Sequence, residues 1–400
     1  MAAAPGELAS RGGGADGFPM TKPSLQMVHG QPSWVVRSSH VHACLTRLGG
    51  HLGPVAFRLG NRTVSPFSVA PWAEEPGARE TIPLLRALRG DFFCAPFGGN
   101  GTPWRGERHP PHGEPAGANW RLAGIEHADD AVTLRARMDL RVRRGRVEKI
   151  VRLPEGQSAV YQRHVISGAR GPMTLGHHAM IKFPDQPGSG VVSTSRFTRA
   201  QVFPGEFESP ENRGYNALKR GATFRSLGKV PLATGGTTDL SVYPARRGYE
   251  DLVMLTADAA LPFAWNAVTF PVQRYAWFAL RDPRALRHTV LWISNGGRHY
   301  APWNGRHTGV MGIEDITGFF HHGLAESARA NPLSRRGIPT TVKLNPRQPT
   351  VVNYIMGAVA VPAGFDRVAD IRAVKDGVEL VAANGKRARA EVDLGWLGGS

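Results

Sequence analysis

The feature that most constrains this chain is the alternation of apolar and polar residues with a period of two. In residues 131–143 (AVTLRARMDLRVR) every second side chain from Val132 to Val142 is apolar, with mostly polar groups between them. Because successive side chains of a strand point to opposite faces, this pattern predicts a long, half-buried β-strand. Residues 147–153 and 159–167 continue in the same style and are separated by a Pro-Glu-Gly turn.

Turn signals at close spacing extend the β pattern to the C-terminus. Asp376-Gly377 and Asn384-Gly385 are hairpin signals, because Gly beside Asn or Asp tolerates the positive φ of tight turns. They divide residues 369–394 into three short strands. Helical periodicity is scarce and favours only short helices, at 83–89 and 321–330. The sequence therefore predicts an all-β fold, a large antiparallel β-sandwich with few short helices.

The 48 glycines and 31 prolines are spread along the chain, as expected for many strands joined by turns. We find no convincing linker or repeat, and so expect one domain over residues 25–400. Residues 1–24 are small and Gly-rich, without a basic start or an apolar segment, and predict a flexible leader. Cys44 and Cys94 are the only cysteines, and no apolar run is long enough to cross a bilayer, so we expect a cytoplasmic protein without a membrane partner.

The formal net charge of +17 raises the question of a nucleic-acid partner. Such a partner requires basic residues gathered into a stripe or a tail. Here the arginines are scattered, and their densest group, at 141–146 (RVRRGR), has the character of a strand end and a turn. We therefore expect no nucleic-acid partner.

Polar residues that could serve a site occur in segments spread along the chain. The apolar segment 91–100 (DFFCAPFGGN) ends in Asn100, and residues 111–120 (PHGEPAGANW) carry His112. An imidazole can donate to or accept from a hydroxyl group at neutral pH. Each segment also has a purely structural interpretation. The first would be a buried strand with a Gly-rich turn, and the second a loop histidine beside prolines.

Residues 176–183 (GHHAMIKF) read as a strand that carries two adjacent histidines. His177 and His178 would point to opposite faces of that strand. Two such residues cannot easily bind one ion, and we expect no metal.

Two further segments carry carboxylates. Residues 247–255 (RGYEDLVML) place Glu250 and Asp251 just before an apolar strand, where either a turn acid or a hydroxyl-binding carboxylate would fit. Glu314 lies in an uncharged neighbourhood rich in Gly and aromatic residues, downstream of Trp303, and Asp315 would face the other way. Partial burial there would raise the pKa of the Glu314 carboxyl toward that of a usable base.

In their order, these segments resemble the aldose 1-epimerases, the galactose mutarotase-like proteins. Members of that family also open with a strand, a Gly-Gly turn and a second strand, as residues 41–59 do here. The resemblance extends over roughly residues 35–330 and implies the galactose mutarotase-like supersandwich. The family has an arginine or an asparagine near the position of Asn100. This chain departs from the family in two places: no arginine directly matches that position, and Met180 replaces an aromatic residue.

The resemblance implies a general base at Glu314 and a general acid at His178, with no cofactor. It further implies a set of residues that position a small-molecule carbohydrate: His112, Asn100, Glu250 with its neighbour Asp251, and Trp303. The implied reaction is the interconversion of sugar anomers by ring opening and closure. Two alternatives stay open, a glycoside-processing hydrolase or lyase on the same scaffold, which would need a second carboxylate, and a non-catalytic sugar-binding protein.

Overall fold

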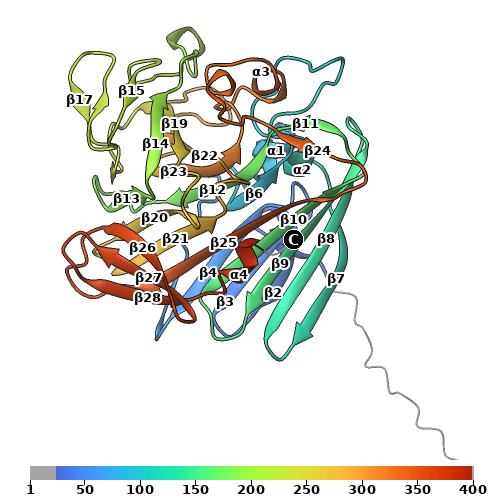
Figure 1. Ribbon diagram of the computed structural model, residues 1–400, viewed down its shortest axis with the longest axis vertical. Helices are drawn as coiled ribbons and strands as arrows, with labels where there is room; N and C mark the ends of the chain where they lie inside the picture. Colours follow the sequence, from blue (N-terminus) through green and yellow to red (C-terminus); the bar gives the residue numbers. More distant parts are fainter. Residues whose placement is uncertain (1–23, 399–400) are drawn as a thin grey trace, which may run out of the picture.

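Two large antiparallel sheets stacked face to face form the body of the protein (Figure 1). The structure is a computed structural model and describes residues 24–398. The predicted leader, residues 1–24, therefore lies outside the described part except for its last residue, and the single-domain assignment of 25–400 stays a prediction. No described helix is long and apolar enough to span a bilayer.

The first sheet has twelve strands in the order β1-β2-β3-β4-β6-β12-β23-β22-β19-β14-β15, with β5 paired to β4. Its strands are β1 (Gln26–Val28), β2 (Gln31–Arg37), β3 (Val41–Thr46), β4 (Leu52–Leu59), β5 (Arg62–Val64), β6 (Asp91–Cys94), β12 (Leu175–Lys182), β14 (Phe197–Val202), β15 (Thr223–Phe224), β19 (Tyr249–Ala257), β22 (His288–Asn295) and β23 (Val310–Thr317).

The second sheet has nine strands in the order β18-β13-β20-β21-β25-β10-β9-β8-β7. Its strands are β7 (Arg121–Ala128), β8 (Ala131–Leu140), β9 (Gly145–Pro154), β10 (Ala159–Ser167), β13 (Gly190–Thr194), β18 (Val242–Tyr243), β20 (Ala264–Phe270), β21 (Tyr275–Arg281) and β25 (Thr350–Ala360).

Small sheets and short helices complete the described chain. The small sheets pair β11 (Gly171–Met173) with β24 (Val342–Leu344), β16 (Val230–Pro231) with β17 (Thr237–Thr238), and β26 (Val368–Val374) with β27 (Gly377–Ala382) and β28 (Arg387–Glu391). The helices are α1 (Pro83–Ala87), α2 (Glu114–Gly117), α3 (Leu324–Ala328) and α4 (Gly395–Gly398), with 3₁₀ turns η1 (Pro76–Glu80), η2 (Pro210–Asn212) and η3 (Ser334–Arg336).

The strands that alternation and turn signals predict are confirmed, with small shifts at their ends. The predicted strand at 131–143 is β8, whose apolar face from Val132 to Leu140 packs into the core between the two large sheets. It ends at Leu140 because the next four residues turn into β9, which pairs Gly145 with Leu140. The two C-terminal hairpin signals lie at the turns between β26, β27 and β28.

Apolar residues gather in three clusters, one on each side of the two sheets and one between them. The largest fills the space between the sheets. A second covers the outer face of the nine-stranded sheet, beneath the meander β26–β28. The third lies on the outer face of the twelve-stranded sheet, where α1, α2 and the loops around 203, 303 and 320 pack on it. This last cluster surrounds the candidate site.

Candidate active site

The floor of the candidate site is the outer face of the twelve-stranded sheet at its centre. His178 on β12 and Glu314 on β23 are direct partners in the register of two neighbouring antiparallel strands. On the flanking strands Phe92 and Trp292 point to the same face, since they belong to the outer cluster rather than to the core between the sheets. Strand pairing therefore brings together side chains that lie up to about 220 residues apart in sequence.

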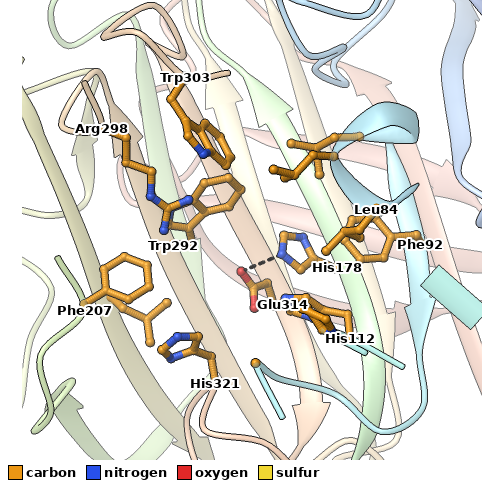
Figure 2. Close-up of a pocket in the computed structure, with 15 residues that line it drawn as sticks. Leu84, Phe92, His112, His178, Phe207, Trp292, Arg298, Trp303, Glu314 and His321 are labelled. Carbon is orange, nitrogen blue, oxygen red and sulfur yellow. Dashed lines mark ion pairs between the residues drawn. The ribbon is translucent and has the colours of Figure 1, made fainter. Parts of the chain in front are cut away.

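A cavity of about 200 Å³ lies over this floor (Figure 2). Its walls are mostly apolar and aromatic, with a few polar groups, which is typical of small-molecule sites. The lining residues are Leu84, Leu85, Leu88, Phe92, Gly99, Pro111, His112, His178, Phe207, Leu252, Trp292, Arg298, Trp303, Glu314 and His321. Four of the predicted site residues are among them: Glu314, His178, His112 and Trp303.

Glu314 and His178 form a direct contact, with 3.1 Å between Glu314 Oε1 and His178 Nε2. Both are almost fully buried, at 2% and 4% exposed. Burial raises the pKa of the Glu314 carboxyl well above its ordinary value, although Arg298 opposes the shift. Burial lowers the pKa of His178 to about 3. Desolvation penalises the charged forms, so burial favours a pair that holds one proton on the carboxyl and carries no net charge.

Glycine makes room for the Glu314 carboxylate. Gly312 stands two residues earlier on the same face of β23, and a Cβ there would lie 2.9 Å from Glu314 Oε1 and 3.1 Å from Trp292 Cβ. The Gly-Ile-Glu order of the sequence thus has a local reason: a larger residue would displace the carboxyl group from the cavity.

His112 lies next to His178 in an aromatic corner. Its ring centroid is 5.1 Å from that of His178 and 5.1 Å from that of Phe97, each at a steep angle. Its Nδ1 atom lies 3.5 Å from the Cys94 thiol. Burial lowers the pKa of His112 well below its ordinary value, and the neighbouring His178 lowers it further. His112 therefore enters the site as a neutral imidazole.

Arg298 and Trp303 build the opposite wall. The Arg298 guanidinium lies over the Trp303 ring at 4.6 Å and over the Trp292 ring at 5.3 Å. Its Nε donates to Glu208 Oε1 at 2.5 Å. Burial lowers the pKa of Arg298, but the carboxylates of Glu250 and Glu208 outweigh burial and raise it. Within residues 24–398 its two Nη groups have no hydrogen-bond partner, so they are donors available to a ligand.

Glu250 and Asp251 do not line the cavity. Glu250 is fully buried behind Trp292, whose indole N–H donates to Glu250 Oε2 at 2.9 Å, and Ser294 Oγ donates to Oε1 at 2.9 Å. Asp251 bonds the backbone N–H groups of residues 217 and 218 at 3.0–3.3 Å. In the structure Glu250 holds Trp292 and its neighbour Asp251 holds a loop, and their predicted contacts with a sugar stay a prediction.

Asn100 also lies outside the cavity lining. Its amide Nδ2 donates to three carbonyl groups, those of Pro96, Gly98 and Pro110, at 3.0–3.1 Å. Its Oδ1 accepts from the backbone N–H of Leu324 at 3.0 Å. These hydrogen bonds use its amide to join two loops, and its predicted contact with a sugar stays a prediction. Those loops carry His112 and His321 into the cavity.

The residues that sequence reasoning missed are Arg298, His321, Trp292 and Phe207. Arg298 follows the Asn-Gly-Gly sequence at the end of β22. An arginine directly after a turn that ends an apolar strand is the sequence feature that could have marked it as a site residue. It occupies the site from a different segment than the one near Asn100 where an arginine was expected. His321 was read only as part of a short helix; burial lowers its pKa to about 3.

Among the described residues, no group of three or more His, Cys, Asp or Glu side chains is arranged to hold a metal ion. No family model and no curated protein matches the sequence.

Solved structures do match the fold. A protein provisionally named an aldose 1-epimerase, from Escherichia coli K12, aligns with a TM-score of 0.54 at 14% identity, over 83% of this chain and 100% of its own. A galactose mutarotase-like protein from Clostridium acetobutylicum aligns with a TM-score of 0.53 at 11% identity, over 84% and 98%. A galactose mutarotase related enzyme from Lactobacillus acidophilus aligns with a TM-score of 0.52 at 10% identity, over 82% and 97%. The chain therefore has the β-sandwich fold of the aldose 1-epimerase and galactose mutarotase-like superfamily.

Proposed function

We propose that this protein is a sugar 1-epimerase, which interconverts the α and β anomers of a reducing hexose or a hexose derivative. The observation that carries the proposal is the buried contact between Glu314 and His178 inside an aromatic cavity of about 200 Å³. The names of the structural neighbours support the same class of substrate. The cytoplasmic location stays a prediction.

The contact between the two side chains suits the reaction. The ring oxygen and the anomeric hydroxyl of an aldose are bonded to the same carbon, so an acid and a base that are neighbours can reach both. The carboxylate of Glu314 takes the proton of the anomeric hydroxyl while the imidazolium of His178 protonates the ring oxygen. The C1–O5 bond breaks, C1 becomes an aldehyde, and the C1–C2 bond rotates. Ring closure returns each proton and yields the other anomer.

One proton on the pair is enough for this cycle. The reactive form, carboxylate with imidazolium, and the form that burial favours, carboxylic acid with neutral imidazole, differ by the transfer of one proton across the 3.1 Å contact. Both carry no net charge, so the transfer adds no charge to the cavity. Arg298 lowers the pKa of Glu314 and thereby favours the reactive form. Its free Nη groups and the neutral His112 would bond sugar hydroxyls, and Trp303 would face the apolar side of the ring.

The hydrolase alternative finds less support. Glycoside hydrolysis usually requires two carboxyl groups that flank the bond. Glu314 is the one carboxylate among the residues that line this cavity, whereas Glu250 lies behind Trp292 and Asp315 is on the other face of the sheet. Sugar binding without turnover remains the second candidate, because the burial that favours a neutral pair also disfavours the ionised base.

The test is anomer exchange measured by NMR saturation transfer over a panel of free aldoses. Glu314→Gln keeps the shape of the side chain but cannot take a proton. We expect a loss of about 10²–10⁴-fold in kcat with at most a small change in KM. Exchange as fast as that of the wild type would remove Glu314 as the base. Sugar binding in calorimetry, together with no exchange by the wild type, would decide for the binding protein.

A further inference from the structure

A second cavity adjoins the candidate active site. It measures about 410 Å³ and is lined by Glu206, Phe207, Glu208, Ser209, Asn212 and Tyr300. The two cavities share Phe207 as a wall. Figure 2 shows Phe207 and Arg298 on the opposite side of the first cavity from His178 and Phe92, with Glu314 between them. The second cavity thus begins on the side of the first that faces away from His178.

Arg298 connects the linings of the two cavities, because it lines the first and bonds a residue that lines the second. Its guanidinium faces the first cavity and lies 5.1 Å from the Phe207 ring centroid, while its Nε donates to Glu208 Oε1 at 2.5 Å. The Tyr300 hydroxyl donates to Glu208 Oε2 at 3.2 Å. Glu208 itself is only 7% exposed. Buried, charge-assisted hydrogen bonds therefore hold Arg298 in place at the boundary of the two cavities.

The charges of the second cavity are balanced. Glu208 is paired with Arg298, and Glu206 with Arg220 at 3.2 Å. Beyond these pairs, the lining offers the Asn212 amide and the rings of Phe207 and Tyr300. Ser209 is buried, and its side chain bonds Glu211. The Asn212 side chain is exposed and has no hydrogen-bond partner in the described part of the chain. Aromatic rings beside uncharged hydrogen-bonding groups fit a neutral polyhydroxylated ring better than a cation or an anion.

The position of the second cavity defines which part of a ligand enters it. Under the proposed function, on which this inference rests, C1 and the ring oxygen of the sugar lie at Glu314 and His178. A ring that lies across the cavity from His178 toward Phe207 has its far edge, at C4, at Phe207 and Arg298. We propose that the second cavity is a subsite for a glycosyl residue linked to O4 of the reducing sugar, so that the preferred ligands are reducing disaccharides or longer chains.

Calorimetry and NMR anomer exchange on the full chain test this proposal, with glucose as the monosaccharide and cellobiose, maltose and lactose as its 4-linked disaccharides. We expect at least one disaccharide to bind about tenfold more tightly than glucose. Asn212→Ala should weaken disaccharide binding about fivefold and leave glucose binding and exchange unchanged, because it removes one hydrogen bond outside the first cavity. Asn61→Ala, in the exposed turn between β4 and β5, is the matched control and should change neither ligand.

The outcomes separate this inference from the proposed function. Glucose that binds and exchanges while no disaccharide binds more tightly would overturn the subsite alone. Tight disaccharide binding that depends on Asn212, without anomer exchange, would support the subsite and overturn the epimerase. Failure of all four sugars to bind at millimolar concentration would overturn the subsite, and the absence of exchange over the whole panel of free aldoses would overturn the epimerase as well.

Discussion

At the scale of single residues, the candidate site contains ionisable groups whose pKa values are shifted from their ordinary values by burial. Glu250 is the clearest case apart from Glu314 and His178. Burial raises the pKa of its carboxyl to about 7, against the opposing effects of Arg298 and of hydrogen bonds from Ser294 and Trp292. The folded chain therefore binds a proton that the unfolded chain releases above the ordinary value of 4.5.

This shift predicts how stability changes with pH. Because the pKa of Glu250 is raised on folding, its contribution is fully present at low pH and is lost as pH rises from about 4.5 to about 7. The loss amounts to about 3 kcal/mol. We expect the Tm of Glu250→Gln to rise relative to that of the wild type between pH 5 and pH 8, since the amide does not ionise. The buried histidines, whose pKa values burial lowers to about 3, affect both proteins alike.

Thermal unfolding across that pH range is the measurement. Asp251 acts in the same direction, because burial raises its pKa to about 6, so the variant keeps part of the slope. Parallel Tm curves for the wild type and Glu250→Gln would show that Glu250 has an ordinary pKa in the folded protein.

At the scale of elements, β12 and β23 present two successive register pairs on opposite faces. The outer pair is His178 with Glu314, and the inner pair is His177 with Asp315. On the inner face His177 Nδ1 lies 2.8 Å from Asp91 Oδ2, and its ring stacks on Tyr354 at 4.1 Å. The residues next to His178 and Glu314 are thus fixed in the core between the sheets.

The Tyr354 hydroxyl closes this inner network. It donates to Asp315 Oδ2 at 2.7 Å, and Asp315 also pairs with Arg281 at 2.8 Å. All three side chains are buried, at 0–2% exposed. The network ties β23 of one sheet to β21 and β25 of the other, and so fixes the position of the strand that carries Glu314.

Tyr354→Phe removes one buried hydrogen bond to a charged group. We expect the free energy of unfolding to fall by about 1.5–3 kcal/mol, with a smaller loss of anomer exchange as Glu314 is held less firmly. Urea unfolding and NMR exchange measure the two effects. Tyr275→Phe is the matched control, because no described residue bonds the Tyr275 hydroxyl, and it should change stability by less than about 0.5 kcal/mol. Equal effects of the two variants would argue against the network.

At the scale of the whole molecule, each of the three apolar clusters stabilises a different part of the structure. One joins the two large sheets, one surrounds the candidate site, and one joins the nine-stranded sheet to the C-terminal meander β26–β28. The meander lies on the face of the sandwich away from the site. We therefore expect the packing of the meander to affect the free energy of unfolding but not the rate of anomer exchange.

Leu380 tests this separation. It is fully buried on β27 within the cluster under the meander. We expect Leu380→Ala to lower the free energy of unfolding by about 2–5 kcal/mol, through lost burial and the cavity left behind. The folded variant should keep wild-type kcat and KM for anomer exchange. Val272→Ala, at a residue that is 79% exposed, is the control and should be nearly neutral. A change in kcat would indicate that the meander also shapes the site.

The local pattern of the sequence determined the elements. Alternation defines β8, and Asp-Gly and Asn-Gly define the turns of the meander, because strand faces and tight turns depend on neighbouring residues alone. The histidine pair also carried enough local information to separate His178 from His177, which the structure confirms by placing them on opposite faces of β12.

Only the tertiary structure decided which of the candidate side chains share a cavity. His178 and Glu314 are in contact because their strands pair in register. The amide of Asn100 instead donates hydrogen bonds to carbonyl groups of its own loop, outside the cavity lining. Arg298 enters from a loop about 200 residues away from the segment where an arginine was expected. Which side chains share the cavity depends on long-range strand pairing and loop packing. A short sequence segment contains no information about the distant residues that these contacts place beside it.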